Sequence, residues 1–162
     1  MALATAEAIR NQIATLLEAL TPSNLSSTKF RQFRNEGDAD FDSVMEKNPP
    51  AALRRFQVRE VGDDEPPLVS NLATERVRLR VEIRIAYPQT HRYGPANGMD
   101  RDDVMNQDWR DINYKIGLYG RGNFSSTHDC TPLGAVKTRE EGGKIDYLVI
   151  AADYEYLRSL TA

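Results

Sequence analysis

The stretch from residue 74 to residue 87, TERVRLRVEIRIAY, constrains the fold of this chain more than any other. Its side chains alternate between apolar and polar, and a period of two is typical of a β-strand with one buried face. At about 3.3 Å per residue the stretch spans roughly 45 Å, whereas a compact chain of this length has a radius of gyration of about 15 Å. We therefore predict a long strand that extends beyond its own domain. Its predicted core residues are Val77, Leu79, Val81, Ile83, Ile85 and Tyr87.

The opposite face of this strand carries arginine at nearly every second residue, with neighbours about 7 Å apart. This spacing is shorter than the screening length of roughly 8 Å in physiological salt, so the arginines repel one another unless carboxylates lie opposite. Three arrangements would satisfy them: a solvated face paired with Glu82 and carboxylates of neighbouring strands, a protein partner with matching acids, or a nucleic-acid backbone. The arginines are Arg76, Arg78, Arg80 and Arg84.

Length and composition limit the class of protein. A chain of 162 residues is long enough for one core, and we expect a single domain over residues 1–162. The net charge of −3 argues against a dedicated nucleic-acid binder, which usually has a basic excess. Sixteen arginines against five lysines favour assembly, because arginine is common at protein interfaces.

The single cysteine, Cys130, excludes an intrachain disulfide and favours a reducing compartment. No apolar run suggests a signal peptide or a membrane span, so we expect a soluble protein.

Two helices and three further strands are predicted from the remaining patterns. Apolar residues at helical spacing predict a helix over residues 4–20, with Thr5 as its N-cap. A cluster of aspartates followed by spaced apolar residues predicts a second helix over residues 100–118. The last strand is apolar on both faces in its first half, which is typical of a central strand. The predicted strands are residues 56–61, 135–139 and 145–157.

The order of these elements predicts the α+β class, with an antiparallel or mixed β-sheet, one long strand, two helices packed on one face, and long loops. We expect residues 56–61 to pair antiparallel with the long strand. Pro88 is expected to end the ladder of the long strand, because proline has no N–H to donate. The connection over residues 21–50 is expected to hold a short strand or helix around Phe30 or Phe41.

Catalytic chemistry is not expected from the residues present. His128, Asp129 and Cys130 place an imidazole, a carboxylate and a thiol together in sequence. Catalytic groups converge in space, and residues adjacent on a loop rarely point at the same atom. Residues 120–125, GRGNFS, lack the third glycine of a dinucleotide fingerprint and follow a helix where that motif follows a strand. We therefore expect neither an enzyme nor a cofactor site.

A metal site is not expected either. Asp38, Asp40 and Asp42 begin like a calcium-binding loop, but Ser43 and Pro49 stand where such a loop needs its glycine and its closing glutamate. Two histidines and one cysteine offer no zinc spacing.

The element pattern as a whole resembles a known family. It combines an N-terminal helix of the AEAIR type, a long loop containing Phe, Asp and Pro, and a long strand ending in AYP. A helix that starts with aspartate and a final strand reading DYLVIAADYEY follow. Together these elements resemble the tail terminator proteins, also called tail completion proteins, of long-tailed bacteriophages. The resemblance covers most of the chain as a pattern of elements, and it carries over no individual functional residues.

The resemblance implies a structural virion protein of the tail and neck, assembled in the host cytoplasm. Such proteins form a ring, commonly a homohexamer, that caps the tail tube, terminates its polymerisation and joins it to the head. The implied partners are further copies of the chain, the tail tube protein and the head-tail connector or stopper protein, while DNA passes through the lumen without specific binding. The alternatives are another phage neck, head-completion or tube protein, or a protein-binding adaptor module outside phages.

The arginine face supplies a hypothesis for the subunit contact. We expect its arginines to meet acidic residues of an adjacent subunit, with no cofactor or metal involved. A channel-lining face would instead bind added DNA with a steep salt dependence. The residues of the predicted contact are Arg76, Arg78, Arg80 and Arg84 on one side and Asp63, Asp64 and Glu65 on the other, with residues 38–42 as a second acidic candidate.

Overall fold

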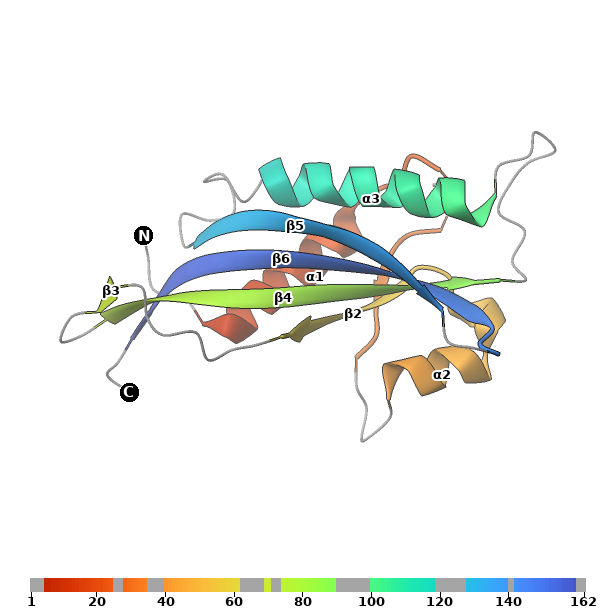
Figure 1. Cartoon of the computed structure of the whole chain (residues 1–162), viewed down its shortest axis with the longest axis horizontal. Coiled ribbons are helices and arrows are strands. Elements are labelled where there is room, and N and C mark those ends of the chain that lie inside the picture. The colour runs from red at the N-terminus through yellow and green to blue at the C-terminus, as the bar shows by residue number, and fades with distance from the viewer. Residues whose placement is uncertain are drawn as a thin grey trace.

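The structure, a computed structural model, describes residues 5–24, 28–34, 40–61, 69–70, 74–89, 100–118, 128–139 and 142–159. Within these residues, three α-helices pack on one mixed β-sheet (Figure 1), so the predicted α+β class is confirmed. The helices are α1 (Ala6–Ala19), α2 (Phe41–Lys47) and α3 (Arg101–Leu118), with a 3-10 turn η1 (Pro49–Ala51). The strands are β1 (Arg31–Gln32), β2 (Arg55–Glu60), β3 (Val69–Ser70), β4 (Thr74–Pro88), β5 (His128–Arg139) and β6 (Ile145–Ser159).

The strand order in the sheet is β1-β2-β4-β6-β5, and β3 pairs with the first residues of β4. Among the described strands, β1 and β2 run parallel and the other pairings are antiparallel. The predicted antiparallel pairing of β2 with the long strand is confirmed, and β6 is central as its apolar first half indicates. Residues from both ends of the chain therefore build the same sheet.

The long strand β4 has a partner of equal length in β6, whereas the sequence predicts one long strand. β4 and β6 each have 15 residues and pair without interruption from Thr74 opposite Ser159 to Pro88 opposite Ile145. β2 covers only the part of β4 from Val81 to Ile85. Figure 1 shows the β4–β6 pair continuing past the ends of α1 and α3, towards β3. The ladder thus extends beyond the helix layer, as the alternation of residues 74–87 predicts.

One face of the sheet packs on α1 and α3, which form the predicted layer of two helices. The Thr5 side chain accepts a hydrogen bond from the N–H of Ala8 at 3.1 Å and so caps α1 as predicted. Apolar side chains one turn apart on each helix meet the apolar face of the long strands. The core includes Ile9, Ile13 and Leu17 of α1, Val104, Met105 and Ile112 of α3, and Val77, Leu79, Val81, Ile83, Ile85, Leu148, Ile150 and Tyr154 of the sheet.

The third helix, α2, packs on the other face at one end of the sheet. Asp40 caps it by accepting from the N–H of Ser43 at 3.2 Å. This contact gives one aspartate of the apparent calcium loop a structural role. The helix and the segment after β1 enclose a second, smaller cluster whose members are Phe33, Phe41, Met45, Ala52, Ala86, Ile145 and Tyr147.

The predicted end of the β4 ladder at Pro88 is confirmed, since Pro88 is the last residue of the strand. Pro88 still lies opposite Ile145, and the N–H of Gln89 donates to the carbonyl oxygen of Lys144 at 2.9 Å. Since Gln89 forms the hydrogen-bonded pair with Lys144, Pro88 occupies a non-hydrogen-bonded position, where its missing N–H costs no ladder bond.

Candidate interface

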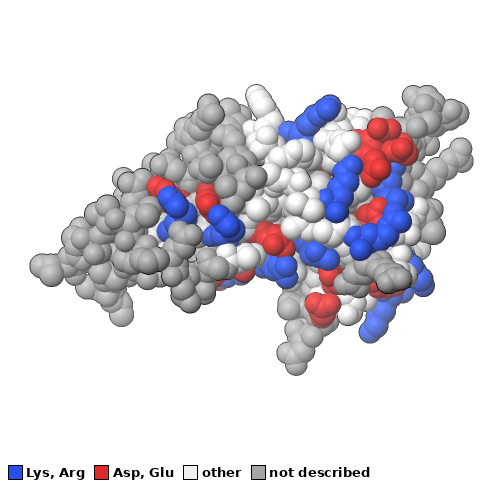
Figure 2. All heavy atoms as spheres, viewed as in Figure 1, with Lys and Arg blue, Asp and Glu red and all other residues white. Residues whose placement is uncertain are grey.

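The face of the sheet opposite α1 and α3, here called the open face, carries the arginines of β4. Because side chains alternate along a strand, Arg78, Arg80 and Arg84 project away from the core formed by their neighbours. Figure 2 shows this face, with basic and acidic side chains next to one another and an uncharged region between them. Its described members are Arg59 of β2, Arg78, Arg80, Glu82 and Arg84 of β4, Val149, Ala151, Asp153 and Glu155 of β6, and Val136 of β5.

Two arginines of β4 pair with carboxylates directly across the strand. Arg80 lies opposite Asp153 and donates from Nε to Oδ1 at 2.9 Å and from Nη2 to Oδ2 at 3.2 Å. Arg78 lies opposite Glu155, and its Nη2 donates to Oε1 at 3.0 Å. Opposite charges at facing positions are the favourable arrangement for a cross-strand pair.

A third pair joins β2 to β4. Arg59 lies opposite Glu82, and its Nη2 donates to Oε1 at 2.6 Å. Glu82 therefore neutralises an arginine of the neighbouring strand and none of its own. Beside these pairs the open face is apolar, because Val149 and Ala151 of β6 are half-buried and Val136 of β5 is 62% exposed.

Arg84 pairs with α2. Its Nε and Nη2 donate to Oδ1 and Oδ2 of Asp42, both at 2.8 Å, in a bidentate ion pair. Its guanidinium also lies 4.1 Å from the ring centroid of Tyr147, within cation–π distance. Only 15% of the Arg84 side chain is exposed, so the contact holds α2 against the sheet.

The ion pairs within the chain concern the same arginines as the predicted subunit contact. Each of Arg78, Arg80 and Arg84 pairs with a carboxylate of its own chain, as in the alternative of a solvated face paired with neighbouring carboxylates. Asp42, a member of the second acidic candidate, is used within the chain by Arg84. The other predicted members, namely the side chain of Arg76 and residues Asp63, Asp64 and Glu65, lie outside the described residues.

A buried ion pair that the sequence does not reveal connects α3 to the start of β2. The side chains of Arg54 and Asp108 are both 0% exposed. Arg54 donates from Nε to Oδ2 at 2.8 Å and from Nη2 to Oδ1 at 2.7 Å. Its Nη1 also donates to the carbonyl oxygen of Thr28 at 2.8 Å, and its Nη2 to that of Asn24 at 2.7 Å. One guanidinium therefore fixes α3, β2 and the segment before β1.

Arg54 adopts a backbone conformation that is unfavourable for a residue with a Cβ, with φ of 57°. The N–H of Arg54 donates to Ala86 at 2.9 Å and its carbonyl accepts from Arg31 at 3.1 Å, so sheet contacts hold this conformation. Burial raises the pKa of Asp108, while hydrogen bonds from Arg54 and Tyr87 oppose that shift. Because both side chains are fully buried and bind three segments of the chain, the ion pair holds these segments together.

A second buried carboxylate lies on β6, between β4 and β5. Asp146 of β6 accepts from Nε and Nη2 of Arg139 at 2.6 and 3.0 Å and from Nε2 of Gln89 at 3.1 Å. Nε of Arg101, at the start of α3, lies 2.6 Å from Oδ2. Burial alone would raise the pKa of Asp146, but the hydrogen bond from Arg139 and the charge of Arg101 hold it below the usual value.

A different arrangement of arginines occurs at the edge of the sheet around β1. This group, here called the basic edge, consists of Arg31, Arg34 and Arg55. Arg31 lies opposite Arg55 in the parallel β1–β2 pair, and among the described residues no carboxylate forms an ion pair with any of the three. Nε of Arg55 is buried and has no hydrogen-bond partner, while its guanidinium lies 5.7 Å from the ring centroid of Phe33.

The remaining candidates from the sequence include a histidine, an aspartate and a cysteine next to one another. His128, Asp129 and Cys130 are the first three residues of β5, and their side chains lie outside the described part of the structure. Within the part of the chain that the structure describes, no three His, Cys, Asp or Glu side chains are grouped to hold a metal ion. None of the described helices combines the length and the apolar character that crossing a membrane requires.

Comparison with known proteins does not assign the chain to a family. No family model matches the sequence, and no curated protein matches it.

Proposed function

We propose that this chain is a tail terminator of a long-tailed bacteriophage, a structural subunit that forms a ring of about six copies on the end of the tail tube. The ring would stop polymerisation of the tube and present its other side to the head connector. The proposal rests on the likeness of the element pattern to that family and on an α+β fold of the kind the likeness implies.

The observation that carries the proposal is the β4–β6 ladder. Its 15 paired residues run past α1 and α3, so none of the described helices covers its outer part (Figure 1). The open face beside it combines neutralised charges with exposed Val136. Extended sheet surface of this kind is typical of a subunit that completes its packing against neighbours.

The mechanism we propose consists of interfaces only. A heterologous contact, in which one patch of a copy binds a different patch of the next, closes into a ring when the rotation per copy divides a full turn. One side of that ring then binds the tube and the other binds the connector. DNA passing through the lumen would meet arginines that already have carboxylate partners, which fits passage without specific binding.

The predicted contact through Arg78 and Arg80 remains a prediction within this proposal. It requires each arginine to share or exchange the carboxylate that it now contacts. The variant Arg78→Gln/Arg80→Gln, which places no like charge opposite Glu155 and Asp153, is expected to weaken ring assembly while leaving the monomer folded, and rings of normal yield would contradict this contact.

The function is tested by adding the purified protein to polymerising tail tube protein. We expect tubes of limited length, each with a ring of density at its end in negative-stain images. Arg110→Glu, a charge reversal at an exposed position of α3, serves as the matched control and should cap tubes as wild type does. Tubes that grow without limit and carry no ring would overturn the proposal.

A further inference from the structure

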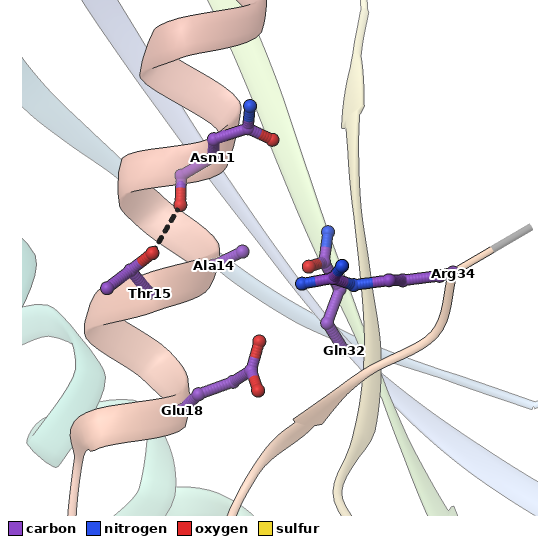
Figure 3. A pocket seen from close by; sticks show the side chains of 6 residues that line it. All are labelled: Asn11, Ala14, Thr15, Glu18, Gln32 and Arg34. Carbon is purple, nitrogen blue, oxygen red and sulfur yellow. Dashed lines mark hydrogen bonds between the residues drawn. The ribbon is translucent and has the colours of Figure 1, made fainter.

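A surface opening separates α1 from β1 and the residues just after it. Its volume is about 340 Å³, which lies within the size range of small-molecule sites. One wall comes from α1 and the other from the edge of the sheet, and Figure 3 shows the two walls facing each other. The lining residues are Asn11, Ala14, Thr15 and Glu18 on the helix wall and Gln32 and Arg34 on the sheet wall.

Both walls are anchored in the core beside the residues that line the opening. Leu17, the neighbour of Glu18, and Phe33, the neighbour of Arg34, are buried. Ala14, which forms part of the helix wall, is buried as well. The backbones that carry Glu18 and Arg34 are therefore fixed by packing, while their exposed side chains extend into the opening from opposite sides (Figure 3).

The opening carries two opposite charges that are not paired with each other. Within the described residues, neither Glu18 nor Arg34 takes part in an ion pair or a side-chain hydrogen bond. Figure 3 marks one hydrogen bond among the lining residues, in which Oγ1 of Thr15 donates to the carbonyl oxygen of Asn11 at 2.9 Å. The donors of the guanidinium and the acceptors of the carboxylate are thus available to a molecule that enters the opening.

The strand edge beside the opening also presents backbone groups. The N–H groups of Arg31 and Phe33 donate to β2, to the carbonyl oxygens of Arg54 at 3.1 Å and Phe56 at 2.7 Å. In a parallel pair the intervening residue directs its backbone away from the partner strand, so the N–H and C=O of Gln32 point outwards from β2. An amide group that lies along this edge can exchange hydrogen bonds with Gln32.

We propose that this opening binds a small zwitterion of the dipeptide class, with its ammonium group at Glu18 and its carboxylate at Arg34. The ligand carboxylate accepts from the guanidinium, and the ammonium group donates to the carboxylate of Glu18. The peptide group between these two ends pairs with the backbone of Gln32. Glu18 repels a purely anionic ligand and Arg34 repels a purely cationic one, so the opening selects a molecule that carries both charges.

The binding of L-alanyl-L-alanine to the purified chain tests the proposal. Saturation-transfer difference NMR detects weak ligands of a monomer and of a ring alike, so the result does not depend on the proposed function. Because both charges of the opening are exposed, we expect a Kd of about 1–10 mM. The acetylated dipeptide lacks the ammonium group and the amidated dipeptide lacks the carboxylate, and each should bind at least about threefold more weakly. No binding, or equal binding of the blocked dipeptides, would overturn the proposal.

Charge variants of the chain locate the site. Glu18→Gln and Arg34→Gln change exposed side chains, so both should stay folded and should bind the dipeptide at least about threefold more weakly. Glu18→Arg/Arg34→Glu exchanges the charges of the two walls and should restore binding with the ligand reversed. Glu7→Gln on α1 and Arg110→Gln on α3, also at exposed positions, are the matched controls and should bind as wild type does. Wild-type affinity in either single variant, or no recovery in the charge swap, would overturn the assignment of the site.

Discussion

The open face and the basic edge contain arginines in similar number but in opposite electrostatic states. On the open face, Arg78 and Arg80 each face a carboxylate of β6, and the register of the sheet aligns them. At the basic edge, Arg31 faces Arg55, and both lack a described acidic partner. The comparison shows that the repulsion implied by closely spaced arginines is resolved by the neighbouring strand. Where the neighbouring strand brings another arginine, no carboxylate of the described residues forms an ion pair with either side chain.

The buried Arg54–Asp108 pair joins an arginine to a carboxylate with neither side chain exposed. Breaking it should change the free energy of unfolding more than any other substitution considered below. Asp108→Leu is expected to lower the free energy of unfolding by about 3–5 kcal/mol, because it leaves a buried guanidinium without its counterion. Arg54→Met/Asp108→Leu should cost less than the two single changes together, since it removes both charges. Urea denaturation followed by circular dichroism measures these values, and additive costs would show that the pair is not coupled.

The ion-paired carboxylate of Asp146 should make the free energy of unfolding depend on pH. Because its pKa is lower in the folded protein than in the unfolded chain, its ionised form contributes stability above the unfolded value of about 3.9. That contribution is lost as pH falls through the folded pKa. Asp146→Asn should therefore cost about 2 kcal/mol at pH 7, and the difference from wild type should shrink below about pH 4. A difference that stays constant from pH 7 to pH 3 would contradict the ion-pair account of this position.

Within the open face, burial should separate two arginines that have similar ion pairs. Arg84→Ala removes a bidentate pair and a contact with Tyr147 in a nearly enclosed position, and we expect a loss of about 1–2 kcal/mol. Arg80→Ala removes a more exposed pair, with 48% of its side chain accessible, and should cost roughly 0.2–1 kcal/mol. Thermal unfolding of both variants side by side decides the order, and an Arg80 effect equal to that of Arg84 would show that burial is not the controlling factor.

The smallest effect on folding is expected at the basic edge. Arg31→Ala should leave the free energy of unfolding within about 0.5 kcal/mol of wild type, with a slight gain at low salt because its repulsion of Arg55 is removed. Measurement at two salt concentrations checks the sign. A clear loss of stability would show that Arg31 has a stabilising contact in the monomer, and the contrast between the two arginine groups would then fail.

The sequence predicts the elements whose periodicity is long and regular. The helix of residues 4–20 and the strand of residues 74–87 are both recovered, because a repeated pattern over many residues overrides local preferences. β5 is predicted only at residues 135–139 because Pro132 and Gly134 resemble a loop. The structure accommodates them in a register shift between the two residues, where Gly134 has φ of 125°.

The pairing of charges depends on contacts that the sequence does not contain. Arg54 and Asp108 are 54 positions apart, and no local pattern connects them. Alternation does place Asp153 and Glu155 on one face of the last strand, but their match with Arg80 and Arg78 follows only from the register with β4. The arginines of the basic edge are likewise unremarkable in sequence, since the parallel pairing of β1 with β2 brings them together.

The mass of the wild-type protein in solution, measured by light scattering after size exclusion with and without tail tubes, tests the ring most directly. We expect particles of about six times the 18.3 kDa of one chain, either alone or once tubes are added, with ring-shaped images in the same fractions. A monomer whose mass is independent of concentration and unchanged by tubes would contradict the terminator proposal.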